Sequence, residues 1–234
     1  MEIEKSDNNI LEIQVAKREQ LPSDKKTLVN LLFLTIPFFV LVPSFLVWSN
    51  NNKPYNITLS NSKISINDGK ILGHYPYDEI SEEDLIKVEP YIYVHKDMYN
   101  SLLKMREEAG KEGIYLVFLS GYRSIKLQEE IFYSLKSQRN QNAAERAKVS
   151  APPGYSEHST GFAIDIGDAE NRQTDFEVDF ENTKAFDWLK KNASRFHFKL
   201  SFDRNHKSVD YEPWHWRYEG SIKALKLFEA SNRD

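Results

Sequence analysis

Two short segments contain the residue types that bind a metal ion and activate water. The first, residues 156–165, reads SEHSTGFAID, and the second, residues 212–216, reads EPWHW. Imidazole and carboxylate groups are ordinary zinc ligands, and a catalytic zinc site typically combines three protein ligands with one water. The sequence therefore predicts one zinc ion held by His158, Asp165 and His215.

The spacing of the first two ligands constrains the backbone between them. Seven residues of strand would hold His158 and Asp165 about 23 Å apart, and seven residues of helix about 10 Å. The chain must therefore reverse direction, and Gly161 is the expected turning point because glycine tolerates a positive φ. Residues 162–166 then read as a short strand, whose alternation places Asp165 and Ala163 on one face and Phe162, Ile164 and Ile166 on the other.

The second segment is expected to form a β-turn. Pro213 suits the second position of such a turn, which brings the α-carbons of Glu212 and His215 within about 7 Å. A water activated by a metal needs a nearby carboxylate that does not coordinate, so Glu212 is predicted to be the general base. The side chains of Trp214 and Trp216 are expected to line the site.

Each of these residues also has an ordinary structural interpretation. A lone histidine is usually not a ligand, a lone aspartate on a strand is usually a cap or solvated, and Glu212 could lie on the surface. The joint pattern favours the metal site. The other histidines carry no such pattern and are interpreted as hydrogen-bonded structural residues: His74, His95, His197 and His206.

The two segments resemble the signatures of a known family. The patterns SxHxxGxAxD at 156–165 and ExxHW at 212–216 are similar to those of the VanY-type D-alanyl-D-alanine carboxypeptidases, in the zinc peptidase group that also holds lysostaphin-like enzymes and the hedgehog domain. Residues 120–124, SGYRS, together with Gln128 resemble the arginine-bearing loop of that family. The resemblance covers about residues 71–229. It implies that Ser156 and Gln128 contact the substrate terminus, and that the substrate is the D-alanyl-D-alanine end of peptidoglycan stem peptides.

The predicted reaction is hydrolysis by zinc-activated water, with Glu212 taking the proton and returning it to the leaving amine. Arg123 could pair with a surface carboxylate, but beside a metal its guanidinium suits an oxyanion or a substrate carboxylate. Several alternatives remain open: an L,D-carboxypeptidase, a dipeptidase or an endopeptidase of the same fold, and a non-catalytic zinc-stabilised module that binds peptidoglycan. Glu212 favours an enzyme, because a binding module has no need of a carboxylate that does not coordinate.

Composition and charge limit the partners that the protein can bind and indicate where in the cell it lies. The net charge of −4 gives no electrostatic basis for binding nucleic acid, and the absence of cysteine excludes disulfides and thiolate ligands. Residues 28–48 carry no formal charge and are long enough to cross a bilayer. Positive charges precede this segment, at Lys17, Arg18, Lys25 and Lys26, so we expect a single-pass plasma-membrane anchor with the catalytic domain outside the cytoplasm. A cleaved signal peptide is the alternative, although the apolar run exceeds the usual length.

The expected organisation is a cytoplasmic tail at 1–26, a transmembrane anchor at 27–48, a tether at 49–70 and a catalytic domain at 71–234. Apolar periodicity predicts helices at 96–108, 125–138, 182–194 and 222–230, the third capped by Asn182 and the last burying Ile222, Leu225 and Phe228. Strands are predicted at 114–119, 162–166, 196–202 and 214–218, and residues 139–155 read as a loop bordering the cleft. This order favours an α+β fold, a small antiparallel sheet with flanking helices, preceded by the transmembrane helix.

Overall fold

The computed structural model describes residues 66–67 and 69–233. The predicted membrane segment at 28–48, the tail before it and most of the tether lie outside the described residues. Within the described residues, no helix has both the length and the apolar character that crossing a bilayer requires.

The described chain is α+β, as predicted, and all of its strand pairs are antiparallel. The strands are β1 (Ile66–Asn67), β2 (Lys70–Ile71), β3 (Leu85–Glu89), β4 (Ile92–His95), β5 (Leu116–Ser120), β6 (Ala163–Asp168), β7 (Phe198–Leu200) and β8 (His215–Tyr218). The α-helices are α2 (Lys96–Lys111), α3 (Ile125–Gln138), α4 (Ala143–Ala147), α5 (Lys184–Asn192) and α6 (Ile222–Leu227). Short 3-10 helices are η1 (Glu82–Asp84), η2 (Glu157–Thr160), η3 (Arg172–Thr174), η4 (Val178–Asn182), η5 (Ala193–Phe196) and η6 (Ser231–Arg233).

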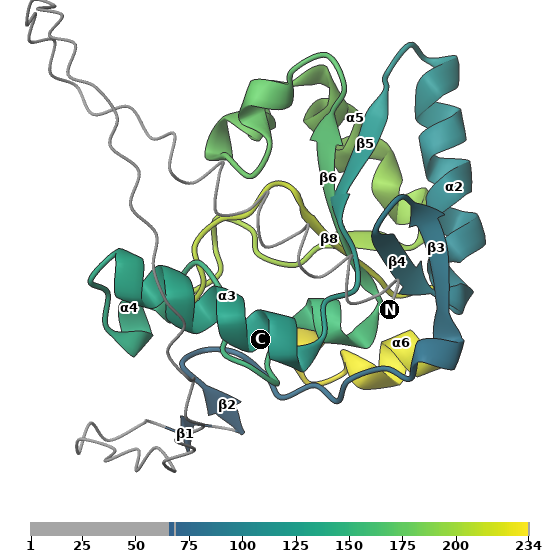
Figure 1. The fold of residues 1–234 in the computed structure, drawn as a ribbon. Helices are drawn as coiled ribbons and strands as arrows, with labels where there is room; N and C mark the ends of the chain where they lie inside the picture. The colour runs from purple at the N-terminus through teal and green to yellow at the C-terminus, as the bar shows by residue number, and fades with distance from the viewer. Residues whose placement is uncertain (1–65, 68, 234) are drawn as a thin grey trace, which may run out of the picture. The chain divides into compact units, whose positions relative to one another are not determined.

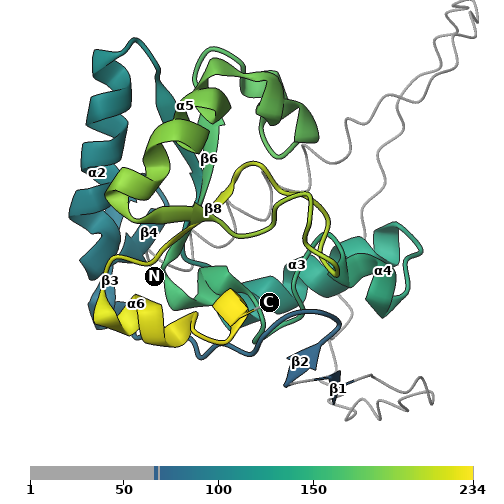
Figure 2. The ribbon, with the colours of Figure 1, turned by 180° about the vertical axis from the view of Figure 1, so that it is seen from behind.

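The largest sheet has four strands in the order β5-β6-β8-β7, whereas β1–β2 and β3–β4 form separate two-stranded pairs. Its apolar face packs on α2 and α5, which Figures 1 and 2 show beside β5 and β6. Strand alternation supplies the sheet side of this core through Ile164, Ile166, Trp216 and Tyr218. The opposite face of β6 and β8 is therefore left to carry polar side chains.

Side-chain caps fix where the helices begin. The Nδ1 atom of His95 accepts a hydrogen bond from the Asp97 amide at the start of α2, and Ser124 Oγ accepts one from the Leu127 amide at the start of α3. Helix α5 is capped by Thr183 and not by the predicted Asn182, which ends η4. Because residue 182 belongs to η4, helix α5 begins at Lys184, two residues later than predicted.

Two further expectations were wrong. The predicted loop at 139–155 contains α4, which begins with a capping box between Asn142 and Glu145. In α6, Ile222 is 73% exposed and Leu225 is 50% exposed, so these two were wrongly predicted to be buried, whereas Phe228 is buried as predicted, together with Ala224. Ala224 and Phe228 are four apart and share one face, and the Phe228 ring packs edge-on against Tyr77.

Candidate active site

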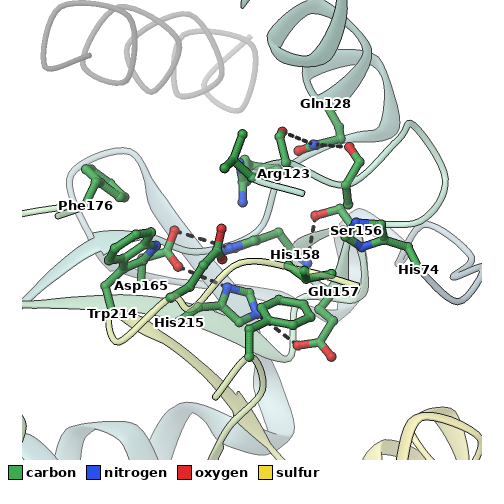
Figure 3. A pocket seen from close by; sticks show the side chains of 16 residues that line it. His74, Arg123, Gln128, Ser156, Glu157, His158, Asp165, Phe176, Trp214 and His215 are labelled. Carbon is green, nitrogen blue, oxygen red and sulfur yellow. Dashed lines mark hydrogen bonds and ion pairs between the residues drawn. The ribbon is translucent and has the colours of Figure 1, made fainter. Parts of the chain in front are cut away.

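The three predicted zinc ligands come together on the polar face of the sheet. Asp165 on β6 is directly paired with His215 on β8, and His158 reaches them from η2. One ligand atom from each lies within 4.8 Å of the other two, and all three side chains are buried. Figure 3 shows the three side chains converging in one pocket.

The predicted reversal between His158 and Asp165 is confirmed. η2 ends at Thr160 and is capped by Gly161, which has φ 71° and donates its amide to the His158 carbonyl at 3.1 Å. The positive φ favours glycine, and a Cβ at this position would be tightly placed, 3.1 Å from the His95 amide nitrogen. The turn delivers the chain into β6 with the Asp165 side chain facing back toward His158.

The predicted turn at Pro213 is also confirmed. The His215 amide donates to the Glu212 carbonyl at 3.0 Å, which closes a β-turn, and Glu212 and Trp214 both line the pocket. Trp216 does not wall the site. It belongs to the core, because strand alternation turns it to the face opposite His215.

The hydrogen bonds of His158 determine which ring nitrogen faces the other ligands. Nδ1 lies 2.6 Å from the Gly121 carbonyl oxygen, which can only accept, so Nδ1 carries the proton. Burial, and then the charge of Arg123, lower the pKa of His158 to about 4. At neutral pH its Nε2 therefore presents a lone pair, 3.3 Å from the Asp165 Oδ2 atom.

His215 is held between two carboxylates. Its Nε2 lies 2.9 Å from Glu157 Oε2, and its Nδ1 lies 3.2 Å from Asp165 Oδ1. Burial opposes protonation, but the hydrogen bonds and charges of Asp165 and Glu157 outweigh it and raise the pKa of His215 to about 10. A metal ion that binds here displaces the proton from Nδ1, because a ligating imidazole must be neutral.

The arrangement fits a divalent cation with borderline ligand preferences. Nε2 of His158, a carboxylate oxygen of Asp165 and Nδ1 of His215 face one another inside the protein. A divalent cation between these atoms would take the place of the proton on His215 Nδ1 and would balance the negative charge of the buried Asp165 carboxylate. Two imidazoles and one carboxylate form a ligand set typical of catalytic zinc.

The other predicted site residues line the same pocket. Arg123 follows β5, Gln128 lies in the first turns of α3, and Ser156 is the N-cap of η2, where its Oγ accepts from the His158 amide. Gln128 Nε2 donates to Ser150 Oγ and the Ala151 carbonyl. Its buried amide oxygen has no hydrogen-bond partner among the described residues and is free to accept from a ligand.

The pocket also contains residues that the sequence analysis did not assign to it. Glu157, Phe176 and Phe202 line it, and so does His74. The structural interpretation of His74 is confirmed, since its Nε2 donates to the Ala147 carbonyl at 2.7 Å. Alternation in the sequence could not reveal Glu157, because a 3-10 helix and not a strand sets its direction.

Comparison with known proteins agrees with this geometry. Residues 91–221 match the family model "VanY: D-alanyl-D-alanine carboxypeptidase". The Bacillus subtilis (strain 168) protein YodJ is 36% identical over 162 residues, covering 67% of this chain and 56% of YodJ. The chain spans about half the length of the curated relatives it matches.

Two solved structures are similar to the folded part of the chain. The LdcB LD-carboxypeptidase has a TM-score of 0.57 and 29% identity, covering 68% of this chain and 79% of that one. VanYB in complex with D-alanine-D-alanine has a TM-score of 0.53 and 25% identity, covering 66% of this chain and 87% of that one. The family match, which spans more than half of the chain, confirms the resemblance stated from the two motifs: the chain belongs to the VanY family of D-alanyl-D-alanine carboxypeptidases.

Proposed function

We propose that this protein is a zinc D,D-carboxypeptidase that removes the terminal D-alanine from peptidoglycan stem peptides ending in D-alanyl-D-alanine. The observation that carries the proposal is the pocket in which three buried metal ligands meet a carboxylate outside the ligand cluster, Glu212. Family membership and the similarity to VanYB, a protein solved with D-alanine-D-alanine, support the substrate.

His158, Asp165 and His215 would hold the zinc ion. A bound zinc ion supplies Lewis acidity, which makes water nucleophilic near neutral pH and polarises the scissile carbonyl. Glu212 lies beside these ligands, across the turn that joins it to His215, so it can take the proton of the attacking water. The same carboxyl group then returns that proton to the departing amine of D-alanine.

The remaining polar residues of the pocket orient the peptide. Arg123 brings a permanent positive charge to the pocket, suited to the oxyanion that develops on the carbonyl or to the terminal carboxylate. The unpartnered amide oxygen of Gln128 can accept a peptide N–H. Ser156 adds a hydroxyl beside His158, and family resemblance assigns both Ser156 and Gln128 to the substrate terminus.

L,D-carboxypeptidase activity is the second candidate, because the LdcB LD-carboxypeptidase has the higher TM-score and identity of the two structures described. Both reactions use the same metal and base, and they differ in the stereochemistry of the residue on the acyl side of the bond. A dipeptidase or endopeptidase would keep the same ligands, whereas a binding module would have no use for Glu212.

Mass spectrometry of defined peptides separates these functions. The full-length chain is incubated with zinc and, separately, with a stem pentapeptide, a stem tetrapeptide and free D-alanyl-D-alanine. Loss of one D-alanine from the pentapeptide alone supports the D,D-carboxypeptidase, and loss from the tetrapeptide supports the L,D-enzyme. A His158→Ala variant controls for contaminating peptidases. No cleavage of any peptide, with retained binding, would favour the binding module.

We also propose that residues 28–48 anchor the protein in the plasma membrane with the catalytic domain outside, where it would meet nascent wall. The support is the uncharged length of this segment and the excess of Lys and Arg before it. Protease added to intact spheroplasts should digest the domain. A domain that is digested only after lysis would contradict this orientation.

A further inference from the structure

Glu157 connects the predicted ligand His215 to a buried guanidinium group. Its Oε2 lies 2.9 Å from His215 Nε2, and its Oε1 accepts from Arg217 Nη1 at 2.8 Å. Ser201 Oγ also donates to Oε2, at 2.6 Å. Glu157, His215 and Arg217 are all buried, and none of the steps proposed above uses Glu157 or Arg217.

The backbone explains why one carboxylate can reach both partners. His215 and Arg217 are two residues apart on β8, so their side chains leave the same face of the sheet. Glu157 begins η2, directly before the ligand His158. The carboxylate that contacts His215 on β8 therefore comes from η2, the same element that carries His158.

Arg217 is itself fixed from the C-terminal part of the chain. Its Nε donates to Glu219 Oε1 at 2.7 Å, its Nη1 donates to Ser231 Oγ at 3.0 Å, and its guanidinium lies 4.9 Å from the centre of the Phe228 ring. These contacts leave Arg217 little freedom, so the position of the Glu157 carboxylate is fixed too. Both oxygens of the Glu157 carboxylate are therefore held, one by Arg217 and the other beside His215.

The contact between Glu157 Oε2 and His215 Nε2 determines which nitrogen of His215 is available to a metal. A carboxylate can only accept, so the ring nitrogen that faces Glu157 must carry a proton. When a metal displaces the proton from Nδ1, the neutral ring keeps its other proton on Nε2 and presents its lone pair from Nδ1, the atom that faces Asp165. Rotation of the ring, or the other tautomer, would remove this lone pair from the ligand cluster.

We propose that Glu157, held by Arg217, is a positioning residue that fixes the ring orientation and tautomer of His215 so that Nδ1 binds the metal. The identity of the metal as zinc rests on the proposed function. Hydrogen-bond partners of ligating histidines typically change metal affinity by about 10- to 100-fold when they are replaced. We therefore expect Glu157 to influence metal affinity without touching metal or substrate.

The test is Glu157→Gln in the full-length chain, with zinc affinity measured by competition with a chelator. An amide cannot accept from His215 and Arg217 at the same time, since one of its two ends is a donor. Zinc affinity should fall about 10- to 100-fold. In zinc-loaded wild type, nitrogen-15 NMR should detect a proton on His215 Nε2 that exchanges slowly with solvent, and in the variant this proton should exchange faster.

Glu219→Gln is the matched control. This variant also replaces a carboxylate that accepts from Arg217. Among the described residues, however, Glu219 forms no hydrogen bond or ion pair with His215, so zinc affinity should stay within about twofold of wild type. If Glu157→Gln does not fold, Glu157→Asp keeps a carboxylate in the cluster but is one methylene too short to hold its hydrogen bond to His215 in place, and affinity should still fall.

The outcomes separate this inference from the proposed function. Wild-type zinc affinity in a folded Glu157→Gln or Glu157→Asp protein would overturn the positioning role, and cleavage of peptide by the wild type would leave the proposed function standing. An equal loss of affinity in Glu219→Gln would also overturn it, because the effect would then be general to the Arg217 cluster. A wild-type protein that binds no zinc would refute both.

Discussion

Asp165 and His215 are paired directly across β6 and β8, and their side chains meet at 3.2 Å on the sheet face opposite the core. Cross-strand partners have Cβ atoms about 4.5–5.5 Å apart, so the backbone hydrogen bonds of the sheet set the separation of these two ligands. Only His158 comes from outside the sheet, and its Nδ1 is fixed by the Gly121 carbonyl. The site is therefore largely formed before a metal binds.

Zinc should stabilise the folded protein through these ligands. At a free zinc concentration about 100-fold above the dissociation constant, the expected gain is about 2.7 kcal/mol, which corresponds to a rise in Tm of roughly 5–10 °C for a domain of this size. Replacing His158, Asp165 or His215 by Ala should abolish most of the rise in a thermal scan. His74→Gln, which alters the pocket but no ligand, should keep it. A full zinc-dependent rise in His215→Ala would show that the ligand assignment is wrong.

Glu212→Gln should separate binding from catalysis. Glutamine keeps the size of the side chain but cannot accept the proton of water, so turnover of a pentapeptide should fall by about 100-fold or more while zinc and peptide still bind. Isothermal titration and a D-alanine release assay measure the two properties. Glu170→Gln, on an exposed position beyond β6, serves as the control. Wild-type release of D-alanine by Glu212→Gln would eliminate the general-base role.

His74 should make stability depend on pH. Burial lowers its pKa from 6.5 to about 4, so between those pH values the unfolded chain binds a proton that the folded chain does not. The free energy of unfolding should therefore fall as pH drops from about 6.5 to 4, by at most about 3 kcal/mol from this residue.

His74→Gln keeps a donor for the Ala147 carbonyl but does not titrate. Urea denaturation of both proteins at several pH values should give a shallower pH dependence for the variant, because the titrations of other groups are common to both. If the stabilities of the two proteins depended equally on pH, the pKa of His74 would have to be the same in the folded and the unfolded protein.

Phe176 should show an unusual order of stability among its variants. Its backbone has φ 58°, a conformation that favours glycine, while its ring packs edge-on against Trp214 in the pocket wall. Phe176→Ala and Phe176→Gly both lose the ring, but only glycine relieves the backbone. The Gly variant should therefore be about 1 kcal/mol more stable than the Ala variant in urea, the reverse of the usual order. Equal stability would show that the backbone relaxes.

The sequence predicted those parts of the site that depend on local geometry. His158, Gly161 and Asp165 lie within eight residues, so their spacing required a reversal, and Pro213 identified the turn that places Glu212 near His215. Regular alternation also gave the core face of β6 correctly. Such features follow from backbone stereochemistry and do not depend on distant parts of the chain.

Other features of the structure depend on contacts between residues that are far apart in the chain. The role of Glu157 depends on Arg217, sixty residues away, and no local pattern reveals that contact. The exposure of Ile222 depends on which helix face meets Tyr77. By contrast, alternation could have placed Trp216 in the core, and the Asn142–Glu145 capping box could have revealed α4.

The pairing of β6 with β8 also has a kinetic consequence. Asp165 and His215 are fifty residues apart in the chain, so the ligand set forms only when this long-range pairing closes, a step that we expect to follow the folding transition state. Zinc should therefore slow unfolding and leave the folding rate almost unchanged. A chain that slipped by one residue in this pair would turn one ligand into the core and could not retain the ion. Metal supply would then set the lifetime of the protein against proteases, and loading with zinc would mark the chains whose strands had paired in the correct register.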